Sequence, residues 1–433
     1  MDFRSRTQRL VARVTGAEPD EAVTLAWGFA WFFCLLLAYY VLRPVRETLG
    51  VERGVEGLKW LFTATFIGML LAVPLYSALV ARVGRKRLVP IAYRFFAMNL
   101  LLFWFALRTD GATRDFASSA FFVWVSIFNL FAVSIFWSFQ ADIFSSAQGK
   151  RLFGFIAAGG TLGAVLGSLI TAELSSFIGT ANLLLLPLVL LEVALFCARR
   201  LDLHASSLST AGEPSGEDRG GTGGGLFEGF SATFRSPYLL AIAAYTLCNA
   251  LLGTTIYFQQ AEVVKAAIED EAARTAFFAR LNLWVQFATV GVQVLITARL
   301  LKAVGVAVAL CILPLIYAVG VGVLGFAPTL AVLAVIDVLR RAGSYAITTP
   351  SREVLFTSLG RTEKYKAKSF LDTVVFRGGD ALASHAYNAL RALGAGGLWM
   401  AAIMIPIAGA WAWIGHKAGR MHQAASRKVE LKA

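Results

Sequence analysis

The sequence predicts an all-α membrane protein in which twelve transmembrane helices form two six-helix pseudo-repeats. Of its 433 residues, 57% are hydrophobic and 15% are charged, whereas a soluble domain carries about 25% charged residues. Apolar runs of about twenty residues, the length that crosses a hydrocarbon core of ~30 Å, recur from end to end. One stretch rich in Ser, Gly and Glu divides these runs into two sets of six.

The predicted spans follow from these apolar runs. We expect them at Ala22–Leu49, Lys59–Ala81, Leu88–Leu107, Phe116–Phe139, Leu152–Phe177, Ala181–Arg199, Tyr238–Gln260, Thr275–Ala298, Ala303–Phe326, Pro328–Arg352, Ser369–Leu393 and Leu398–His416. Residues 201–225 have the composition of a flexible linker, and Leu226–Phe234 is expected to form a short interfacial helix. The predicted domains are a six-helix half over 1–200, a cytoplasmic linker with the interfacial segment over 201–236, and a second half with a cytoplasmic tail over 237–433.

The basic charge of the chain predicts its orientation. The formal net charge is +13, and most of the 40 Lys and Arg residues fall on one side of the membrane if both termini lie on that side. Cytoplasmic loops of membrane proteins carry such an excess. We therefore expect an integral protein of the cell's inner membrane with both termini cytoplasmic. Its partners would be membrane lipids and a small solute, with no nucleic acid, and the chain would be a monomer.

No pattern of residues points to an enzyme, a metal site or a bound cofactor. Cys34, Cys197, Cys248 and Cys311 lie inside apolar segments without paired spacing, which supports neither a disulfide framework nor a zinc site. The four histidines are scattered, and no Ser-His-Asp arrangement stands out. We expect no cofactor and no catalytic activity.

Charged residues at membrane depth are the first candidates for a functional site, because each costs about 2.5–3.5 kcal/mol on insertion scales. Asp337, Arg340 and Arg341 lie in the middle of the tenth span, at spacings that allow the aspartate to pair with either arginine. A guanidinium can bind a phosphate or carboxylate with two hydrogen bonds. The group is either an anion-binding or gating element, or a purely structural ion pair.

The eleventh span carries a second charged group, formed by Asp372, Arg377, Asp380 and His385. Arg377 is a candidate anion ligand, and the other three are candidate coupling or gating residues. Asp380 or His385 would carry a coupling proton. In the alternative interpretation, Asp380 only neutralises Arg377 one turn away.

The eighth span has a polar face made of Asn282, Gln286, Thr289 and Gln293, at spacings of four, three and four residues. Such a face lines a cavity, where Asn282 and Gln286 would orient the substrate, or it binds a neighbouring helix.

In the first span, Arg43 and Arg46 lie in the outer half. They would guide an anion inward, or they extend to the outer interface.

Glycines and a weak internal repeat complete the pattern. Gly159, Gly163 and Gly167 form a small-residue face that is typical of helix packing. The pair Gly159 and Gly160 of the first half parallels Gly378 and Gly379 of the second. Two related halves are typical of alternating-access transporters, in which the substrate site lies near the midplane.

Two stretches resemble known transporter families. Ser77–Lys86, with the sequence SALVARVGRK, resembles the cytoplasmic major facilitator motif G-x-L-a-D-r-x-G-R-K, although Ala81 replaces its aspartate. The alternative is a basic loop that follows the positive-inside rule. Tyr40–Leu49, with the sequence YVLRPVRETL, is similar to the I-L-R-D-T-K-D-T-L stretch of the ATP:ADP translocase family, and Arg46 takes the place of its lysine.

Further similarities to the translocase family lie at Phe136–Phe139, Lys150–Phe153 and Lys366–Gly379. Val125 and Leu252-Gly253 occupy positions at which that family carries acidic residues in its fourth and seventh helices. The resemblance implies a major facilitator fold and an anionic or nucleotide-like substrate, and it does not specify ATP/ADP exchange.

These observations predict a secondary active transporter that moves a small anionic, nucleotide-like or phosphorylated solute by exchange or proton coupling. Arg340, Arg341 and Arg377 would hold the anion, while Asp337 and Asp380 would keep the arginines paired when the site is empty. Two other functions stay open. One is an exporter or flippase of an amphipathic or lipid substrate. The other is a sensor or scaffold on a transporter fold, with the linker or the loop from Lys364 to Lys368 binding a partner.

Overall fold

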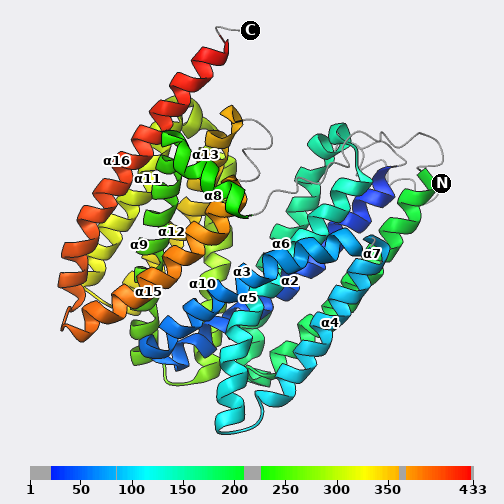
Figure 1. Ribbon diagram of the computed structural model, residues 1–433. Coiled ribbons are helices and arrows are strands. Elements are labelled where there is room, and N and C mark those ends of the chain that lie inside the picture. The colour runs from blue at the N-terminus through cyan, green and yellow to red at the C-terminus, as the bar shows by residue number, and fades with distance from the viewer. Residues whose placement is uncertain (1–20, 84, 209–225, 360–366, 431–433) are drawn as a thin grey trace. The chain divides into compact units, whose positions relative to one another are not determined.

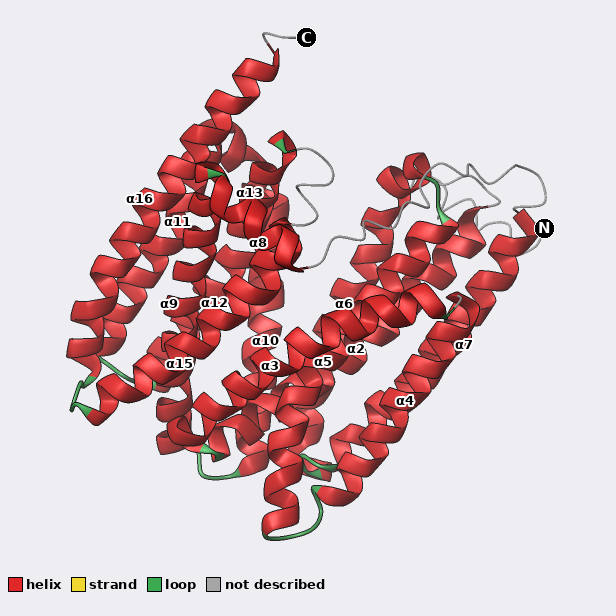
Figure 2. Ribbon diagram, in the orientation of Figure 1, coloured by secondary structure: helices red, strands yellow, loops and turns green. Residues whose placement is uncertain are grey.

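The computed structural model describes residues 21–430, except 84, 209–225 and 360–366. Within this part of the chain the regular structure is helical and no strand occurs (Figure 2). Hydrocarbon offers no hydrogen-bonding partner to a backbone amide or carbonyl, so a membrane-spanning segment satisfies these groups within its own helix. The all-α prediction is confirmed.

Helices of the first half follow the six predicted spans closely (Figure 1). They are α2 (Glu21–Glu52), α3 (Gly54–Arg82), α4 (Arg85–Ala106), α5 (Ala112–Ile143), α6 (Ser146–Ile178), the short η1 (Asn182–Leu184) and α7 (Leu185–Leu208). The start of α6 shows why these boundaries lie where they do. Ser145 accepts a hydrogen bond from the Gln148 backbone, and the Gln148 side chain accepts one from the Ser145 backbone, which together form a capping box.

The second half contains more interruptions. Its elements are α8 (Leu226–Arg235), α9 (Pro237–Ala267), α10 (Glu271–Val292), η3 (Gln293–Thr297), α11 (Ala298–Phe326), α12 (Leu330–Gly343), η4 (Ser344–Thr348), α13 (Thr349–Leu355), η5 (Phe356–Ser358), η6 (Leu371–Val375), α15 (Phe376–Ala392) and α16 (Gly397–Glu430). Three of these elements, η3, η4 and η6, are π-helical turns. Helix α8 occurs where the short interfacial helix was predicted.

Nine helical stretches among the described residues are long and apolar enough to cross a membrane. One of them, Glu271–Phe326, covers both the eighth and the ninth predicted spans, which join at Gly305 with a φ of 73°. The tenth and eleventh predicted spans are assembled from shorter pieces on either side of η4 and η6. All twelve predicted ranges therefore coincide with helical structure.

Two compact units make up the chain. Unit 1 comprises Met1–Leu49, Leu71–Arg219 and Asp270–Leu283, and unit 2 comprises the remainder. Helices α3 and α10 thus each belong partly to one unit and partly to the other. The predicted domain boundaries at 200 and 236 stay a prediction. The predicted linker began at residue 201, but residues 201–208 continue helix α7. The rest of that linker, 209–225, lies outside the described residues.

The core of unit 1 is aromatic. Trp31 of α2 is fully buried and donates a hydrogen bond from Nε1 to the Tyr93 hydroxyl of α4 at 2.9 Å. Its ring centroid lies 5.0 Å from those of Phe136 and Phe139 on α5, in edge-to-face geometry. These contacts join three helices through one side chain.

Helix α6 packs against α2 through its predicted glycine face. A Cβ atom at Gly159, Gly163 or Gly167 would lie 2.7, 2.2 or 2.6 Å from a backbone carbonyl oxygen of α2. No real side chain tolerates such distances, so only glycine allows the two backbones to approach this closely.

Unit 2 contains a matching contact. A Cβ at Gly379 of α15 would lie 2.8 Å from the Ala250 Cβ of α9. Gly160, whose added Cβ would meet the Phe32 ring of α2, and Gly379 are the second members of the two glycine pairs that suggested an internal repeat, and they occupy equivalent packing positions. One lies between the first and fifth spans, and the other lies between the seventh and eleventh.

We predict that Gly163→Ala destabilises the protein because its new methyl group overlaps the Phe33 carbonyl of α2. Overpacking of this kind costs about 1–3 kcal/mol. The measurement is the thermal unfolding of purified protein in detergent. Gly154→Ala on the same helix, where nothing lies within 4 Å of the added Cβ, serves as control. Equal melting temperatures for the two variants would contradict the proposed packing.

Candidate functional site

Asp337 of α12 binds two arginines. Its carboxylate accepts hydrogen bonds from Arg340 and, at 3.2 Å, from Nη1 of Arg341. The Asp337 side chain is 1% exposed, and the arginine side chains are 14% and 10% exposed. Since α12 places residues three and four positions apart on one face, the predicted pairing occurs with both arginines at once.

Arg340 also contacts the neighbouring helices. Its Nη1 donates to the Tyr317 hydroxyl of α11 at 3.0 Å, and its guanidinium carbon lies 5.6 Å from the centre of that ring. On α9, a Cβ at Gly253 would lie 3.3 Å from the Tyr317 hydroxyl and 4.0 Å from Nη1 of Arg340. The glycine therefore leaves room for the tyrosine–arginine pair beside α9.

The next residue of α9, Thr254, contacts the second charged group, which lies on α15. Thr254 donates a hydrogen bond at 2.8 Å to Asp380 of α15, and Asp380 pairs with Arg377 at 3.4 Å. Asp380 is 11% exposed and Arg377 is 34% exposed. Gly253 and Thr254 thus bring α9 into contact with both predicted charged groups.

A polar cavity of about 270 Å³ opens beside this group in unit 2. Arg352, Asp372 and Arg377 supply its charges, and Arg352 pairs with Asp372 at 2.9 Å. The remaining walls come from one face of α9 and from the π turn η4 with its neighbours. These residues are Tyr245, Thr246, Asn249, Ser344, Tyr345, Thr348, Thr349 and Phe376.

Both π turns of the tenth and eleventh spans contribute to this cavity. η4 supplies Ser344, Tyr345 and Thr348, and η6 supplies Asp372. A π turn bonds residue i to i+5 and is frequent at functional sites. The backbone departs from the α-helix at the positions where polar side chains gather.

Sequence reasoning missed Arg352 as a site residue, because it was placed at the inner end of the tenth predicted span. Its side chain is 19% exposed and lies in the cavity wall. The polar face of α9, with Asn249 in an otherwise apolar span, was also missed. Asn249 was the available signal, because an amide within a span needs a polar partner.

His385 lies apart from the cavity lining. Its Nε2 is 2.9 Å from the Thr63 hydroxyl of α3, and its ring packs edge-to-face against Trp60 at 5.3 Å. Nearby on α15, Ser384 and Asn388 donate hydrogen bonds to the backbone carbonyls of Lys59 and Val55. His385 therefore belongs to the contact that holds the first half of α3 against α15 within unit 2.

Arg43 and Arg46 lie in unit 1. Arg46 pairs with Glu47 at 2.8 Å and donates from Nε to the Phe122 carbonyl of α5 at 3.1 Å. Its guanidinium carbon lies 3.7 Å from the centre of the Phe122 ring. Arg43 is half-buried, with its guanidinium carbon 5.8 Å from the Tyr40 ring centre. The contacts of Arg46 anchor α2 to α5.

The predicted polar face of the eighth span is only partly buried. Asn282, Gln286 and Thr289 are 2%, 8% and 7% exposed. Gln293 is exposed, and its Nε2 donates a hydrogen bond to the Tyr345 carbonyl of η4 at 3.5 Å. The unit boundary also crosses this face, with Asn282 in unit 1 and Gln286 in unit 2.

The structure therefore brings together the predicted residues of the tenth and eleventh spans, except His385. Arg43 and Arg46 form a separate group. Within the described residues, no cluster of three or more His, Cys, Asp or Glu side chains has the arrangement of a metal site.

Comparison with known proteins identifies the family. The model of the Major Facilitator Superfamily matches residues 25–384. The chain belongs to the Major Facilitator Superfamily. This major facilitator is an integral membrane transporter and not an enzyme, as the sequence predicted.

Two curated relatives resemble this major facilitator along most of its length. ADP,ATP carrier protein 1 of Chlamydia muridarum is 22% identical over 419 residues, covering 81% of this chain and 78% of the relative. The protein of the same name from Chlamydia trachomatis is 21% identical over 476 residues, covering 93% and 89%. The resemblance to nucleotide translocases is confirmed at this level.

Solved structures show the same fold. The nucleoside transporter NupG aligns with a TM-score of 0.64 at 12% identity, covering 93% of this chain and 98% of NupG. The POT family transporter PepTSo aligns with a TM-score of 0.63 at 13% identity, covering 95% and 99%. Such low identities establish the fold alone.

We predict that Asp337→Asn lowers the free energy of unfolding by about 3 kcal/mol, because it leaves two buried arginines without a counter-charge on α12. Asp372→Asn should cost about 1 kcal/mol or less, since the Asp372 side chain is 39% exposed. Thermal unfolding in detergent measures both. A larger loss for Asp372→Asn would show that Asp337 does not anchor its cluster.

Proposed function

We propose that this major facilitator is a secondary active transporter of a small anionic solute, nucleotide-like or phosphorylated, driven by exchange or proton coupling. The observation that carries the proposal is the polar cavity of unit 2, in which Arg352 and Arg377 face a single lining carboxylate, Asp372. Two guanidinium groups in one cavity suit an oxyanion, since each can donate two parallel hydrogen bonds to it.

The chemistry of the cavity also suits the rest of a nucleotide-like solute. Tyr245, Tyr345 and Phe376 provide aromatic surface, while Asn249 and the hydroxyls of η4 provide hydrogen-bonding groups. Pockets for small molecules commonly combine apolar walls with a few polar groups that orient the ligand. The names of the two chlamydial relatives, ADP,ATP carrier proteins, support the same class of substrate.

The aspartates would hold the arginines when no anion is present. Asp380 pairs with Arg377 and Asp372 with Arg352, so an incoming phosphate or carboxylate competes with these carboxylates. Asp337 would hold Arg340 and Arg341 beside the site, and Asn282 and Gln286 would orient the solute in one conformation of the cycle. Alternating access then exposes the cavity to each side of the membrane in turn.

Coupling of transport to its driving force would involve Asp380 or His385. Release of Asp380 from Arg377 would let the carboxylate take up a proton, and the bond between His385 and Thr63 places a titratable ring at the contact of α3 with α15. In an exchange mechanism neither group would need to change its proton, because the counter-substrate completes the cycle.

We also propose that the protein lies in the inner membrane as a monomer with both termini cytoplasmic. At the ends of α3, α4 and α7 that would then face the cytoplasm, Arg82, Arg87, Arg199 and Arg200 are exposed. This distribution follows the positive-inside rule.

The transport proposal is tested by counterflow in proteoliposomes preloaded with a nucleotide mixture, compared with phosphate, dicarboxylates and a labelled lipid. We predict nucleotide or phosphate counterflow in the wild type and a loss of about tenfold or more in Arg377→Gln and Arg352→Gln. A charge-assisted hydrogen bond contributes about 1.5–3 kcal/mol, and 1.4 kcal/mol corresponds to tenfold.

Arg299→Gln is the matched control, since Arg299 is exposed and donates to the Leu295 backbone carbonyl of its own helix. Wild-type counterflow in both cavity variants would refute the site. Activity with the labelled lipid alone would instead favour a flippase.

The orientation is tested with reporter fusions. A green fluorescent protein fused to the C-terminus should fluoresce, and alkaline phosphatase at the same position should be inactive, because the tail is expected in the cytoplasm. Alkaline phosphatase fused after Asp110, between α4 and α5, should be active. The reverse pattern would invert the proposed topology.

A further inference from the structure

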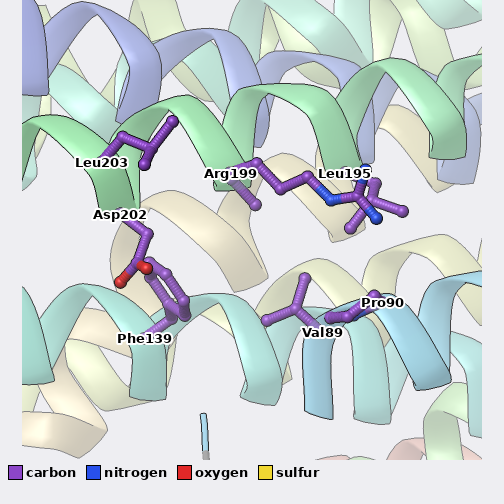
Figure 3. Close-up of a pocket in the computed structure, with 8 residues that line it drawn as sticks. Val89, Pro90, Phe139, Leu195, Arg199, Asp202 and Leu203 are labelled. Atoms are coloured by element: carbon purple, nitrogen blue, oxygen red, sulfur yellow. The ribbon is translucent and has the colours of Figure 1, made fainter. Parts of the chain in front are cut away.

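A groove on unit 1 offers a comparison with the polar cavity of unit 2. Its volume is about 250 Å³, close to the volume of about 270 Å³ of the cavity. The groove lies where α4, α5 and α7 meet, and its walls are mostly apolar, with Val89, Phe139 and Leu195 among them (Figure 3). The described parts of these three helices contain no π turn, whereas η4 and η6 both line the cavity. Polar lining and π turns occur together in unit 2, so the cause of the π turns bears on the site.

Pro350 explains why the chain leaves the α-helix at η4. Proline has no backbone N–H, and within a helix its ring clashes with the carbonyl four residues earlier. In this span that carbonyl belongs to Ala346. The turn is widened here, because the Thr349 N–H donates to the Ser344 carbonyl, five residues earlier, in place of the Tyr345 carbonyl. The carbonyls of Tyr345 and Ala346 therefore both lack their α-helical donors.

The π turn is one of two ways in which a membrane helix accommodates a proline, and the other is a kinked α-helix. In a kinked α-helix only the Ala346 carbonyl would lack its donor, because Thr349 would still donate to Tyr345. The π turn leaves one more carbonyl without an α-helical donor, and hydrocarbon supplies none. The π form of η4 thus depends on donors from outside its own helix.

Two side chains of the neighbouring π turn η3 supply these donors. The Thr297 hydroxyl donates to the Ala346 carbonyl at 2.8 Å, and Nε2 of Gln293 donates to the Tyr345 carbonyl at 3.5 Å. The Thr297 hydroxyl also lies 3.1 Å from the Val292 carbonyl of its own helix, so Ala346 is the closer acceptor. Gln293 and Thr297 are the first and last residues of η3. The polar side chains of one π turn therefore serve the backbone of the other.

Apolar contacts enclose these hydrogen bonds. Ala346 is fully buried, and together with Ile347 it packs against Val292, Leu300 and Leu301. A hydrogen bond in such surroundings is not readily replaced by water, and an unsatisfied carbonyl there is costly. The contact between η3 and η4 is thus suited to fixing the form of η4.

We propose that Thr297 and Gln293 are positioning residues of the transport site, because their bonds hold η4 in the π form and so keep Arg352 in the cavity wall. Neither of them lines the cavity, so they act through the backbone of η4. The inference rests on the proposed function, in which Arg352 binds the solute. When the bonds are removed, the turn relaxes toward the kinked α-helix, and every later residue moves by one position around the helix axis. Ser351 then takes the place of Arg352.

This exchange is tested by the reactivity of a cysteine at position 351. Ser351 is fully buried, whereas Arg352 lines the cavity. In the full-length protein with its four native cysteines replaced by alanine, Ser351→Cys should react slowly with a water-soluble methanethiosulfonate. Addition of Thr297→Val should raise the rate about tenfold, because an unsatisfied buried carbonyl disfavours the π form by about that factor. Gln293→Met should give a smaller rise, because its bond is longer.

Two controls separate a change of register from general loosening. Thr297→Ser keeps the hydroxyl, so Ser351→Cys should react in it as slowly as in the parent. Gly163→Ala, which lowers stability through a contact in unit 1, should also leave the rate unchanged. An unchanged rate in Thr297→Val, or an equal rise in Gly163→Ala, would overturn the proposal.

Pro350→Ala tests the cause assigned to the π turn. It restores an N–H to residue 350 and removes the ring, so an α-helix no longer leaves the Ala346 carbonyl without a donor. Ser351→Cys should then react fast, and Thr297→Val should add no further rise. Additive effects of Pro350→Ala and Thr297→Val would contradict the proposal, because additivity is expected of independent sites.

Counterflow distinguishes this inference from the proposed function. Pro350→Ala should lose counterflow as Arg352→Gln does, since both remove the guanidinium from the cavity wall. If Ser351→Cys responds as expected but Pro350→Ala transports like the wild type, the positioning of Arg352 is confirmed and its role in transport is refuted.

Discussion

Hydrocarbon provides no hydrogen-bonding partners, and most features of this chain follow from that constraint. Backbone groups are satisfied within helices, and many hydroxyl side chains bond to the preceding turn. Thr65, Ser118 and Ser168, for example, each donate to the carbonyl four residues earlier. Buried charged side chains need a counter-charge as well as hydrogen bonds. They are therefore grouped, with Asp337 shared by two arginines and Asp380 held by Thr254 and Arg377.

Because lipid is as apolar as leucine, burial of apolar surface drives helix association less than it does in water. The chain relies instead on close backbone approach, as at Gly163 and Gly379, and on aromatic side chains that bridge helices, such as Trp31. Of these contacts, the one at Gly379 lies in unit 2 and packs α15 against α9, two helices that line the cavity. The cavity thus depends on a packing contact made by a residue outside its lining.

Hydropathy and helical spacing were sufficient to predict the fold and part of the site. The spans could be located because every one needs about twenty apolar residues, and the Asp337 pairs could be predicted because they are local to one turn. The pairs of Arg352 with Asp372 and of Thr254 with Asp380 join different helices, so spacing along one helix did not reveal them.

The π turn η4 changes which residues of the tenth span point into the cavity. It contains one more residue per turn than the α-helix around it, so each residue after it is rotated by about 100° from its α-helical position. Arg352 follows η4 and lines the cavity in that rotated register. The wall is therefore specified by the number of residues in the span as well as by their identity. Loss of Ala346 or Ile347, neither of which lines the cavity, would redirect Arg352 although every lining residue is still present.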